Sequence, residues 1–587
     1  RGHKLHRKYI RQLTVGGFQV YADPVTIPLG PLTLLYGPNS AGKSAILDAM
    51  LALADLCELW TPEKTKLAYD RTTPGRILAR HWRREGAMRA TLADSLRLGA
   101  GIRIGGRDWA LAGFAEAGLI YGLEPKYPKF AECFSCLQPL VEAKEVDVQV
   151  SFQYKLAKPE QFAAAHEVQV GAQLIELGVG GASILRWCAS GWWASINLAH
   201  PALIAWNATD DLKWLAQRYK DVGEDICAHI DGWFSLAICS VTGSSLETNA
   251  LDQLENVPGI PRSAEDRDRE RGAEASFLNM FDALFLACLI VMRDTLRVPV
   301  VSASRAVPRS SEVTFLFDAH ATPLSGEAFG LMLNGLPEHQ PITRAAFISE
   351  MERCGLRKVP KGLLGEILPR SEKNPVDLVN RLLSNYLFQS SGYYVAARIH
   401  ALAALEGFDG ITMNTTADVD RKFLVTLELR DAAGRHFNFD EVGSGLGYVL
   451  PVLLAIGTSD VAFLQQPELH LHPALQCELA DALILALNDV AFGGLQSEGC
   501  KQIIAETHSE HLLLRLLRRV RQTADPKRSL DPHSLGREDI VVLYVDPKPD
   551  GTSIVKHLRI TKDGEFMDRW PRGFFGERDL ELLDDGK

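Results

Sequence analysis

The sequence predicts an α/β protein that is built around a phosphate-binding loop and divided into more than one lobe. The apolar run Leu32–Tyr36 leads into a glycine-rich loop and then into a helical pattern. Two more short apolar runs, 461–464 and 502–505, each end at polar residues, as the strands of a P-loop fold do. The chain has 587 residues. A single hydrophobic core stops growing near roughly 250–300 residues, so we expect several lobes.

Composition places the chain among ordinary globular proteins. Hydrophobic residues make up 46% and charged residues 23%, which excludes a disordered or collagen-like chain. The 10 cysteines are scattered and do not form a disulfide framework, so a reducing compartment is expected. The net charge of -10 argues against general coating of nucleic acid, although a local basic patch can still contact phosphates.

No targeting or membrane segment is expected. The basic stretch Arg1–Tyr9 is not followed by the apolar core of a secretory signal. The most apolar stretch, Met280–Met292, contains Asp282 and is shorter than the roughly 20 residues that a bilayer requires. It predicts a buried helix, and we expect a cytoplasmic protein without membrane contact.

The loop after Leu32–Tyr36 has the pattern of a nucleotide-binding P-loop. In such a loop, Gly37 and Gly42 let backbone N–H groups converge on phosphate oxygens. Lys43 would reach the outer phosphates and Ser44 would hold Mg²⁺. A chance glycine loop is less favoured, because a strand and a helix flank the full pattern. The candidate nucleotide ligands are Gly37, Pro38, Asn39, Ser40, Ala41, Gly42, Lys43 and Ser44.

Polar residues follow the two later apolar runs. Residues 461–464 lead into Gln465, Gln466, Pro467 and Glu468, where a P-loop protein needs groups that reach the metal. Residues 502–505 lead to His508, whose imidazole is a candidate for contact with a γ-phosphate. A structural role for His508 carries about equal weight.

A third glycine segment, 441–448, precedes the apolar run 449–456. It predicts a backbone that approaches an anion at the start of a helix. A plain helix-entry turn is the alternative when the segment is taken alone. Its position between the P-loop and the second strand favours the anion site, with Ser444 and Gly445 as the candidate residues.

The order of these motifs resembles that of the ABC, SMC, RecF and OLD ATPases, in which Walker A, signature, Walker B and switch histidine follow one another. The sequence looks closest to bacterial AAA-family ATPases of the OLD-like group. Three stretches carry this similarity: 467–473, 506–511 and 570–575. It covers residues 9–50 and 420–587 well and the middle of the chain weakly.

The resemblance implies a two-lobed ABC-type ATPase head that dimerises around ATP and Mg²⁺. Ser444 and Gly445 of one subunit would complete in trans the γ-phosphate site that Lys43 of the other subunit holds. Such an arrangement is a closed two-fold assembly. The signature departs from the family pattern at Gly447 and Tyr448, where Ser and Gln commonly stand.

Gln465 and Gln466 stand where most of these relatives carry at least one carboxylate. A neutral amide provides no anionic charge for Mg²⁺ and does not accept a proton as a carboxylate does. We expect Ser44 and Gln465 as metal ligands and Gln466, Glu468 and His508 as the catalytic group. The prediction is slow ATP hydrolysis and a long-lived ATP-bound state, with Gln466 orienting water and Glu468 supplying charge.

We divide the chain into lobe I with the P-loop (1–180), a largely helical insertion (181–400), and lobe II with the signature, Walker B, switch histidine and C-terminal region (401–587). A long coiled coil is not expected, because heptads are not sustained and glycines and prolines interrupt the middle. Residues 146–154 alternate at period two and predict a strand of lobe I. Helical patterns dominate at 210–295 and 342–405.

Other residue clusters carry weaker signals. Two arginine-rich segments are candidates for a phosphate backbone, with the exposed face of an amphipathic helix as the favoured alternative: Arg76, Arg80, Arg83, Arg84 and Arg515, Arg518, Arg519. Arg305 is either near the nucleotide or in a surface ion pair. The pair Cys133 and Cys136 lacks a second pair at zinc spacing. Six tryptophans gather at 187, 192, 193, 206, 214 and 233, with core packing as the favoured role and partner binding as the alternative.

Two functions follow from the resemblance. The first is an ATP-switched sensor and scaffold of bacterial antiphage defence that recruits a partner effector, expected to be a nuclease on another chain because only a short tail follows Phe575. The second is a RecF-like DNA-repair clamp. DNA is a further implied partner in both. The motor of a membrane transporter is disfavoured, since the insertion is too large and no membrane-contact segment is seen.

Overall fold

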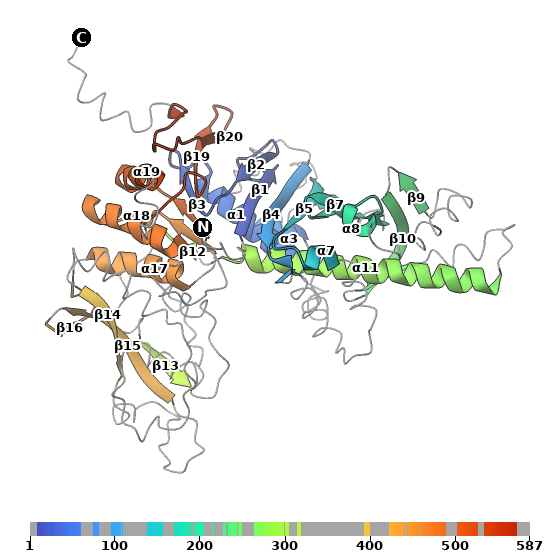
Figure 1. The fold of residues 1–587 in the computed structure, drawn as a ribbon, viewed down its shortest axis with the longest axis horizontal. Helices are drawn as coiled ribbons and strands as arrows, with labels where there is room; N and C mark the ends of the chain where they lie inside the picture. Colours follow the sequence, from blue (N-terminus) through green and yellow to red (C-terminus); the bar gives the residue numbers. More distant parts are fainter. Residues whose placement is uncertain are drawn as a thin grey trace, which may run out of the picture. The chain divides into compact units, whose positions relative to one another are not determined.

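The computed structural model comprises two compact units (Figure 1). The first unit contains residues 1–29, 38–297 and 545–556, and the second contains 30–37, 298–544 and 557–587. The residues that the structure describes are 9–59, 74–81, 95–106, 108–109, 138–156, 170–188, 193–204, 214, 227–230, 233–242, 245–248, 263–298, 300–304, 314–318, 393–399, 422–431, 433–438, 441–442, 444–458, 461–488, 502–525 and 533–571.

A 10-stranded sheet organises the first unit. Each pairing along it is antiparallel. Its order is β11 (Ser245–Thr248), β10 (Trp233–Thr242), β8 (Trp193–Asn197), β7 (Ala182–Cys188), β6 (Val170–Val179), β5 (Val146–Leu156), β4 (Ser95–Ile104), β1 (Tyr9–Gly16) and β2 (Val25–Pro28), with β9 (Cys227–Ile230) on β10.

One face of this sheet is apolar and packs on two helices. Alternate residues of β5, from Val146 to Tyr154, are buried, which confirms the strand predicted at 146–154. Helix α1 (Lys43–Leu59) and helix α11 (Ala264–Leu296) contact each other and the sheet. Short helices α3 (Pro74–His81), α7 (Gln138–Val141) and α8 (Pro201–Ile204) complete the described part of the unit.

Helix α11 contains the predicted buried helix Met280–Met292. It begins at a capping box in which the Ser263 hydroxyl accepts from the Asp266 N–H and the Asp266 carboxylate accepts from the Ser263 N–H. Among the described helices, none combines the length and apolar character needed to cross a membrane.

The prediction that residues 181–400 are largely helical is wrong for the part described. Strands β7 to β11 lie in this range and continue the sheet of the first unit, and only α8, Trp214 and α11 are helical there. These strands are stabilised by pairing with other strands of the sheet, which a local sequence pattern does not reveal. The described segments at 342–405 contain β14 (Tyr393–Ile399) and no helix.

A six-stranded sheet, most of which lies in the second unit, confirms the α/β fold class. Residues 545–556, which include parts of its last two strands, are assigned to the first unit. The pairings from β12 (Val300–Val301) to β19 (Ile540–Pro547) are parallel. All five residues of β3 (Leu32–Tyr36) and of β18 (Gln502–Glu506) are buried, as expected for a parallel sheet covered on both faces. The order is β12 (Val300–Val301), β17 (Val461–Gln465), β18 (Gln502–Glu506), β3 (Leu32–Tyr36), β19 (Ile540–Pro547) and β20 (Ser553–Leu558).

Three helices of the second unit lie beside this sheet, with α17 (Ser444–Thr458) and α19 (Glu510–Ala524) on either side of α18 (Pro473–Asn488) (Figure 1). Helix α19 buries Leu512, Leu513, Leu516, Leu517 and Val520 on one stripe. A smaller sheet contains β13 (Thr314–Asp318), β15 (Lys422–Asp431), β14 and β16 (His436–Phe437).

Candidate functional site

The P-loop, residues 37–44, joins β3 to α1. Its backbone has positive φ at Gly37 (141°), Ser40 (64°) and Gly42 (101°). Gly42 is required sterically as well, because a Cβ at this position would overlap the Val20 side chain. The loop ends at the N-terminus of a 17-residue helix, where backbone N–H groups and the helix dipole favour an anion.

Two residues outside the motif hold the P-loop. The Tyr21 hydroxyl donates to the Gly42 carbonyl at 3.0 Å, and the Ser553 hydroxyl donates to the Ala41 carbonyl at 2.6 Å. The Ser553 N–H also donates to the Val20 carbonyl at 2.9 Å. Ser553 lies 512 residues from Ala41 in the chain, so no local pattern in the sequence marks it.

Lys43 is buried, and its ammonium donates to the Pro38 carbonyl at 2.9 Å. The side chain therefore folds back over the loop and places a positive charge beside its backbone. The role of Lys43 as the phosphate-binding cation of the P-loop stays a prediction.

Helix α3 packs against α1. The Gln19 amide donates to the Asp48 carboxylate at 2.9 Å and to the His81 carbonyl at 2.8 Å, and the His81 ring lies 2.9 Å from the Asp55 carboxylate. Arg76 and Arg80 are on the exposed side of α3. That placement agrees with an ordinary amphipathic helix. Arg83 and Arg84 lie outside the described residues.

Strands β3, β18 and β17 end at one edge of the sheet, here called the carboxyl edge. Glu506 is paired with Leu35 of β3 on one side and with Gln465 of β17 on the other. Beyond the strands, the Thr507 N–H donates to the Leu35 carbonyl at 3.1 Å and the Gln466 N–H donates to the Glu506 carbonyl at 2.7 Å. Because β3 continues into Gly37, the P-loop departs from this edge.

The carboxyl edge thus brings together the ends of the strands predicted as Walker B and as the switch-histidine strand. Glu468 is buried, and its carboxylate accepts from the His508 N–H at 2.8 Å. Gln466 and His470 have φ of 45° and 66°, so the loop between them turns sharply. Glu468 therefore positions the loop that carries His508, a role that sequence reasoning missed.

Tyr36 lies beneath these loops. Its hydroxyl donates to the Ser509 carbonyl at 3.1 Å, next to His508. Burial raises the pKa of Tyr36, and the charge of Glu468 raises it further. Trp570 packs edge-on against Tyr36 with ring centroids 5.3 Å apart, and also contacts Phe566 and Tyr544. Residues 572–575 of the predicted C-terminal similarity lie outside the described part of the chain.

The predicted signature helix, α17, packs on the loop that follows β17. The Tyr448 ring stacks on the His470 ring with centroids 4.2 Å apart. A Cβ at Gly445 would lie 3.4 Å from the His470 carbonyl oxygen. Gly443 and the side chain of Ser444 lie outside the description, so the contact of Ser444 and Gly445 in trans stays a prediction.

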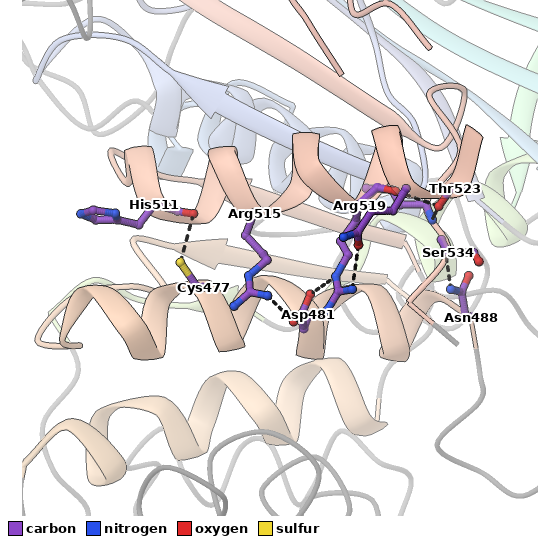
Figure 2. A network of polar contacts seen from close by, with 10 residues as sticks. Cys477, Asp481, Asn488, His511, Arg515, Arg519, Thr523 and Ser534 are labelled. Carbon is purple, nitrogen blue, oxygen red and sulfur yellow. Dashed lines mark hydrogen bonds and ion pairs between the residues drawn. The ribbon is translucent and has the colours of Figure 1, made fainter. Parts of the chain in front are cut away.

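The arginines of α19 form a clamp with α18, shown in Figure 2. Arg519 donates twice to the buried Asp481 carboxylate, both times at 2.8 Å, and Arg515 lies 3.4 Å from it. These two side chains therefore hold two helices together, a role that differs both from phosphate binding and from the exposed helix face predicted as the alternative. Asn488 donates to the Ser534 carbonyl at 2.7 Å in the same region.

The described tryptophans of the central region have structural roles. Trp187 is buried and packs edge-on against Phe285 at 5.8 Å, while Arg186 lies over the Trp233 ring at 4.2 Å. Trp192, Trp206, Arg305, Cys133 and Cys136 lie outside the described residues.

Residues 344–515 match the family model described as "AAA domain, putative AbiEii toxin, Type IV TA system". The chain is similar to P-loop ATPases of the AAA type. The match ends within α19 and includes β17 and β18, whereas the P-loop lies outside it. Together with the P-loop, it confirms the predicted resemblance to P-loop ATPases and supports an ATP-binding ATPase activity.

No curated protein matches the sequence. Among solved structures, the SMC head domain with an extended coiled coil bound to the C-terminal domain of ScpA from Pyrococcus furiosus is similar at 9% identity and a TM-score of 0.32, covering 98% of this chain and 99% of that chain. The SMC head domain from Thermotoga maritima is similar at 9% identity and a TM-score of 0.31, covering 94% and 100%.

Proposed function

We propose that this chain is an ATP-binding, slowly hydrolysing ATPase that dimerises around ATP and serves as a sensor and scaffold for an effector protein in bacterial antiphage defence. The single observation that carries the ATPase part is the carboxyl edge, where the P-loop strand, the Gln465 strand and the His508 strand end side by side. The defence role rests on the OLD-like resemblance and on the family description, which names a putative toxin of a toxin–antitoxin system.

In the proposed site, residues 37–44 bind the phosphates of ATP through the N–H groups of the P-loop and the Lys43 ammonium. Ser44 and Gln465 offer oxygen ligands of the kind that Mg²⁺ prefers. When bound, this ion neutralises charge on the terminal phosphates. Gln466 orients the attacking water, and His508, held through Glu468, contacts the γ-phosphate.

Slow turnover follows from the two glutamines. Neither Gln465 nor Gln466 accepts a proton from water, so attack on the γ-phosphate lacks a strong general base at this position. A long-lived ATP-bound dimer, closed by Ser444 and Gly445 of the other subunit, would then present a stable surface to an effector. We propose a nuclease encoded on a separate chain as that effector, and DNA as a further partner.

The test is the mass of the purified protein in solution with and without ATP. We expect an ATP-dependent increase in mass that Lys43→Ala abolishes, and retention of the product of the neighbouring gene only in the ATP-bound form. Absence of nucleotide binding by the wild-type chain would overturn the proposal. ATP hydrolysis stimulated by duplex DNA without any partner would favour a RecF-like clamp over the effector scaffold.

A further inference from the structure

The 10-stranded sheet of the first unit has a polar face opposite the apolar face that packs on α1 and α11. A hollow of about 530 Å³ lies on this polar face, and all of its lining residues belong to the first unit. Its volume is within the range of small-molecule sites, about 300–1,000 Å³. Six strands, β1, β2, β4, β5, β6 and β7, line this hollow, with polar side chains that include Gln12, Thr14, Arg97, Gln149, Ser151 and Glu176.

Two glycines lie in the floor of the hollow. Gly99 of β4 is paired with Thr14 of β1 and with Ser151 of β5, and Gly178 of β6 is paired with Gln149 of β5. A Cβ at Gly99 would lie 2.9 Å from the Cβ of Ser151, so a larger residue would crowd the polar side chains beside it. Glycine inside a strand weakens the strand and often marks a position where a ligand approaches the backbone.

Arg97 of β4 brings a positive charge to the hollow. The side chain is partly buried, and its Nε–H group is fully buried without a hydrogen-bond partner among the described residues. Buried polar groups in native proteins nearly always have a partner. The Arg97 Nε–H therefore indicates an acceptor that a bound molecule supplies.

Two other arginines of this sheet differ from Arg97, because each has a carboxylate of its own. Arg103 donates to Asp147 at 2.9 Å, and Arg186 donates to Glu176 at 2.9 Å. Glu176 also lines the hollow, but Arg186 balances its charge. The charge of Arg97 is thus left to attract an anion.

We propose that this hollow binds a small sugar phosphate, with the phosphate group on Arg97. A guanidinium group binds two phosphate oxygens through paired hydrogen bonds. The hydroxyls of Thr14 and Ser151, from the strands on either side of β4, add donors for a group that has three acceptor oxygens. The amides of Gln12 and Gln149 both donate and accept, as the hydroxyls of a sugar require. This inference does not depend on the ATPase function proposed above.

The test is titration of the full chain with ribose 5-phosphate, followed by calorimetry. The wild-type chain should bind this probe, and Arg97→Gln should weaken binding about 10–100-fold through loss of a hydrogen bond between charged groups. Thr26→Trp places a large side chain on the exposed edge strand β2, where it fills the hollow, and should abolish binding. Arg271→Gln, which changes an exposed arginine of α11 in the same unit, is the matched control and should leave the affinity unchanged.

Lys43→Ala distinguishes the hollow from the P-loop and should leave the affinity for ribose 5-phosphate unchanged. Loss of binding in Lys43→Ala together with full binding in Arg97→Gln would place the probe at the P-loop and overturn the inference. A wild-type chain that does not bind the probe would overturn it too. If Arg97→Gln does not fold, full binding by Thr26→Trp has the same meaning. Loss of ATP binding alone would refute the ATPase function and not this inference.

Discussion

The carboxylate of Glu468 accepts a hydrogen bond from the backbone N–H of His508 at 2.8 Å. This bond joins the loop after β17 to the loop after β18, so it links the predicted Walker B segment to the backbone of the predicted switch histidine. Glu468, which the sequence predicted as a catalytic residue, therefore positions the backbone of the loop that carries His508.

Removing this acceptor should destabilise the second unit and slow ATP hydrolysis. We expect Glu468→Ala to lower the free energy of unfolding by about 1–3 kcal/mol, because the partly buried His508 N–H loses its partner. Glu468→Gln keeps an acceptor oxygen, so its free energy of unfolding should fall less. Urea denaturation of both variants measures this quantity, and an equal decrease in the two variants would contradict a stabilising role of the hydrogen bond.

The contact of Ser553 with the P-loop should contribute to nucleotide affinity. Ser553→Ala removes the donor to the Ala41 carbonyl, and a typical hydrogen bond contributes about 0.5–1.5 kcal/mol. We expect ATP to bind roughly 2–10-fold more weakly by calorimetric titration. Ser263→Ala, at the N-cap of α11, should cost about 1 kcal/mol of stability without changing ATP affinity.

The clamp between α18 and α19 should contribute to stability and not to nucleic-acid binding. Asp481→Ala leaves the guanidinium of Arg519 without its bidentate partner, so we expect a loss of about 3–5 kcal/mol in the free energy of unfolding. Arg518→Ala, on the exposed side of α19, should change stability by less than about 0.5 kcal/mol. Chemical denaturation measures the free energy of unfolding of both variants. Equal losses in Asp481→Ala and Arg518→Ala would contradict a stabilising role of the ion pair between α18 and α19.

The ion pair of Arg559 with Asp568 should give an acid-dependent contribution to stability. The hydrogen bonds from the Arg559 side chain and backbone lower the pKa of Asp568 from 3.8 to about 2. A carboxyl with a lowered pKa in the folded state stabilises above its unfolded pKa, and this contribution is lost as the pH falls. The advantage of the wild type over Asp568→Asn should be present above about pH 4 and disappear toward pH 2.

Thermal unfolding across this pH range measures the difference. Asp563→Asn, in the same loop, serves as the control. A wild-type advantage that stayed constant down to pH 2 would contradict the assignment.

The sequence by itself determined the local elements with strong patterns. Three features were predictable: the strand, glycine loop and helix from Leu32 to Leu59, the strand at 146–154, and the polar ends of β17 and β18. Each depends on periodicity or backbone requirements of residues that are neighbours in the sequence. The long range 181–400 was predicted wrongly in its described part, since its strands depend on pairing partners that lie far apart in the chain.

Only the tertiary structure decided which distant residues act together. Ser553 reaches the P-loop across 512 residues, and Glu506 becomes the neighbour of Gln465 through the register of β17 and β18. Arg519 binds Asp481 of the neighbouring helix, although the sequence pattern favoured an exposed helix face for it. Strand register and helix packing follow from the burial of the whole core, a global free-energy minimum that no short segment encodes alone.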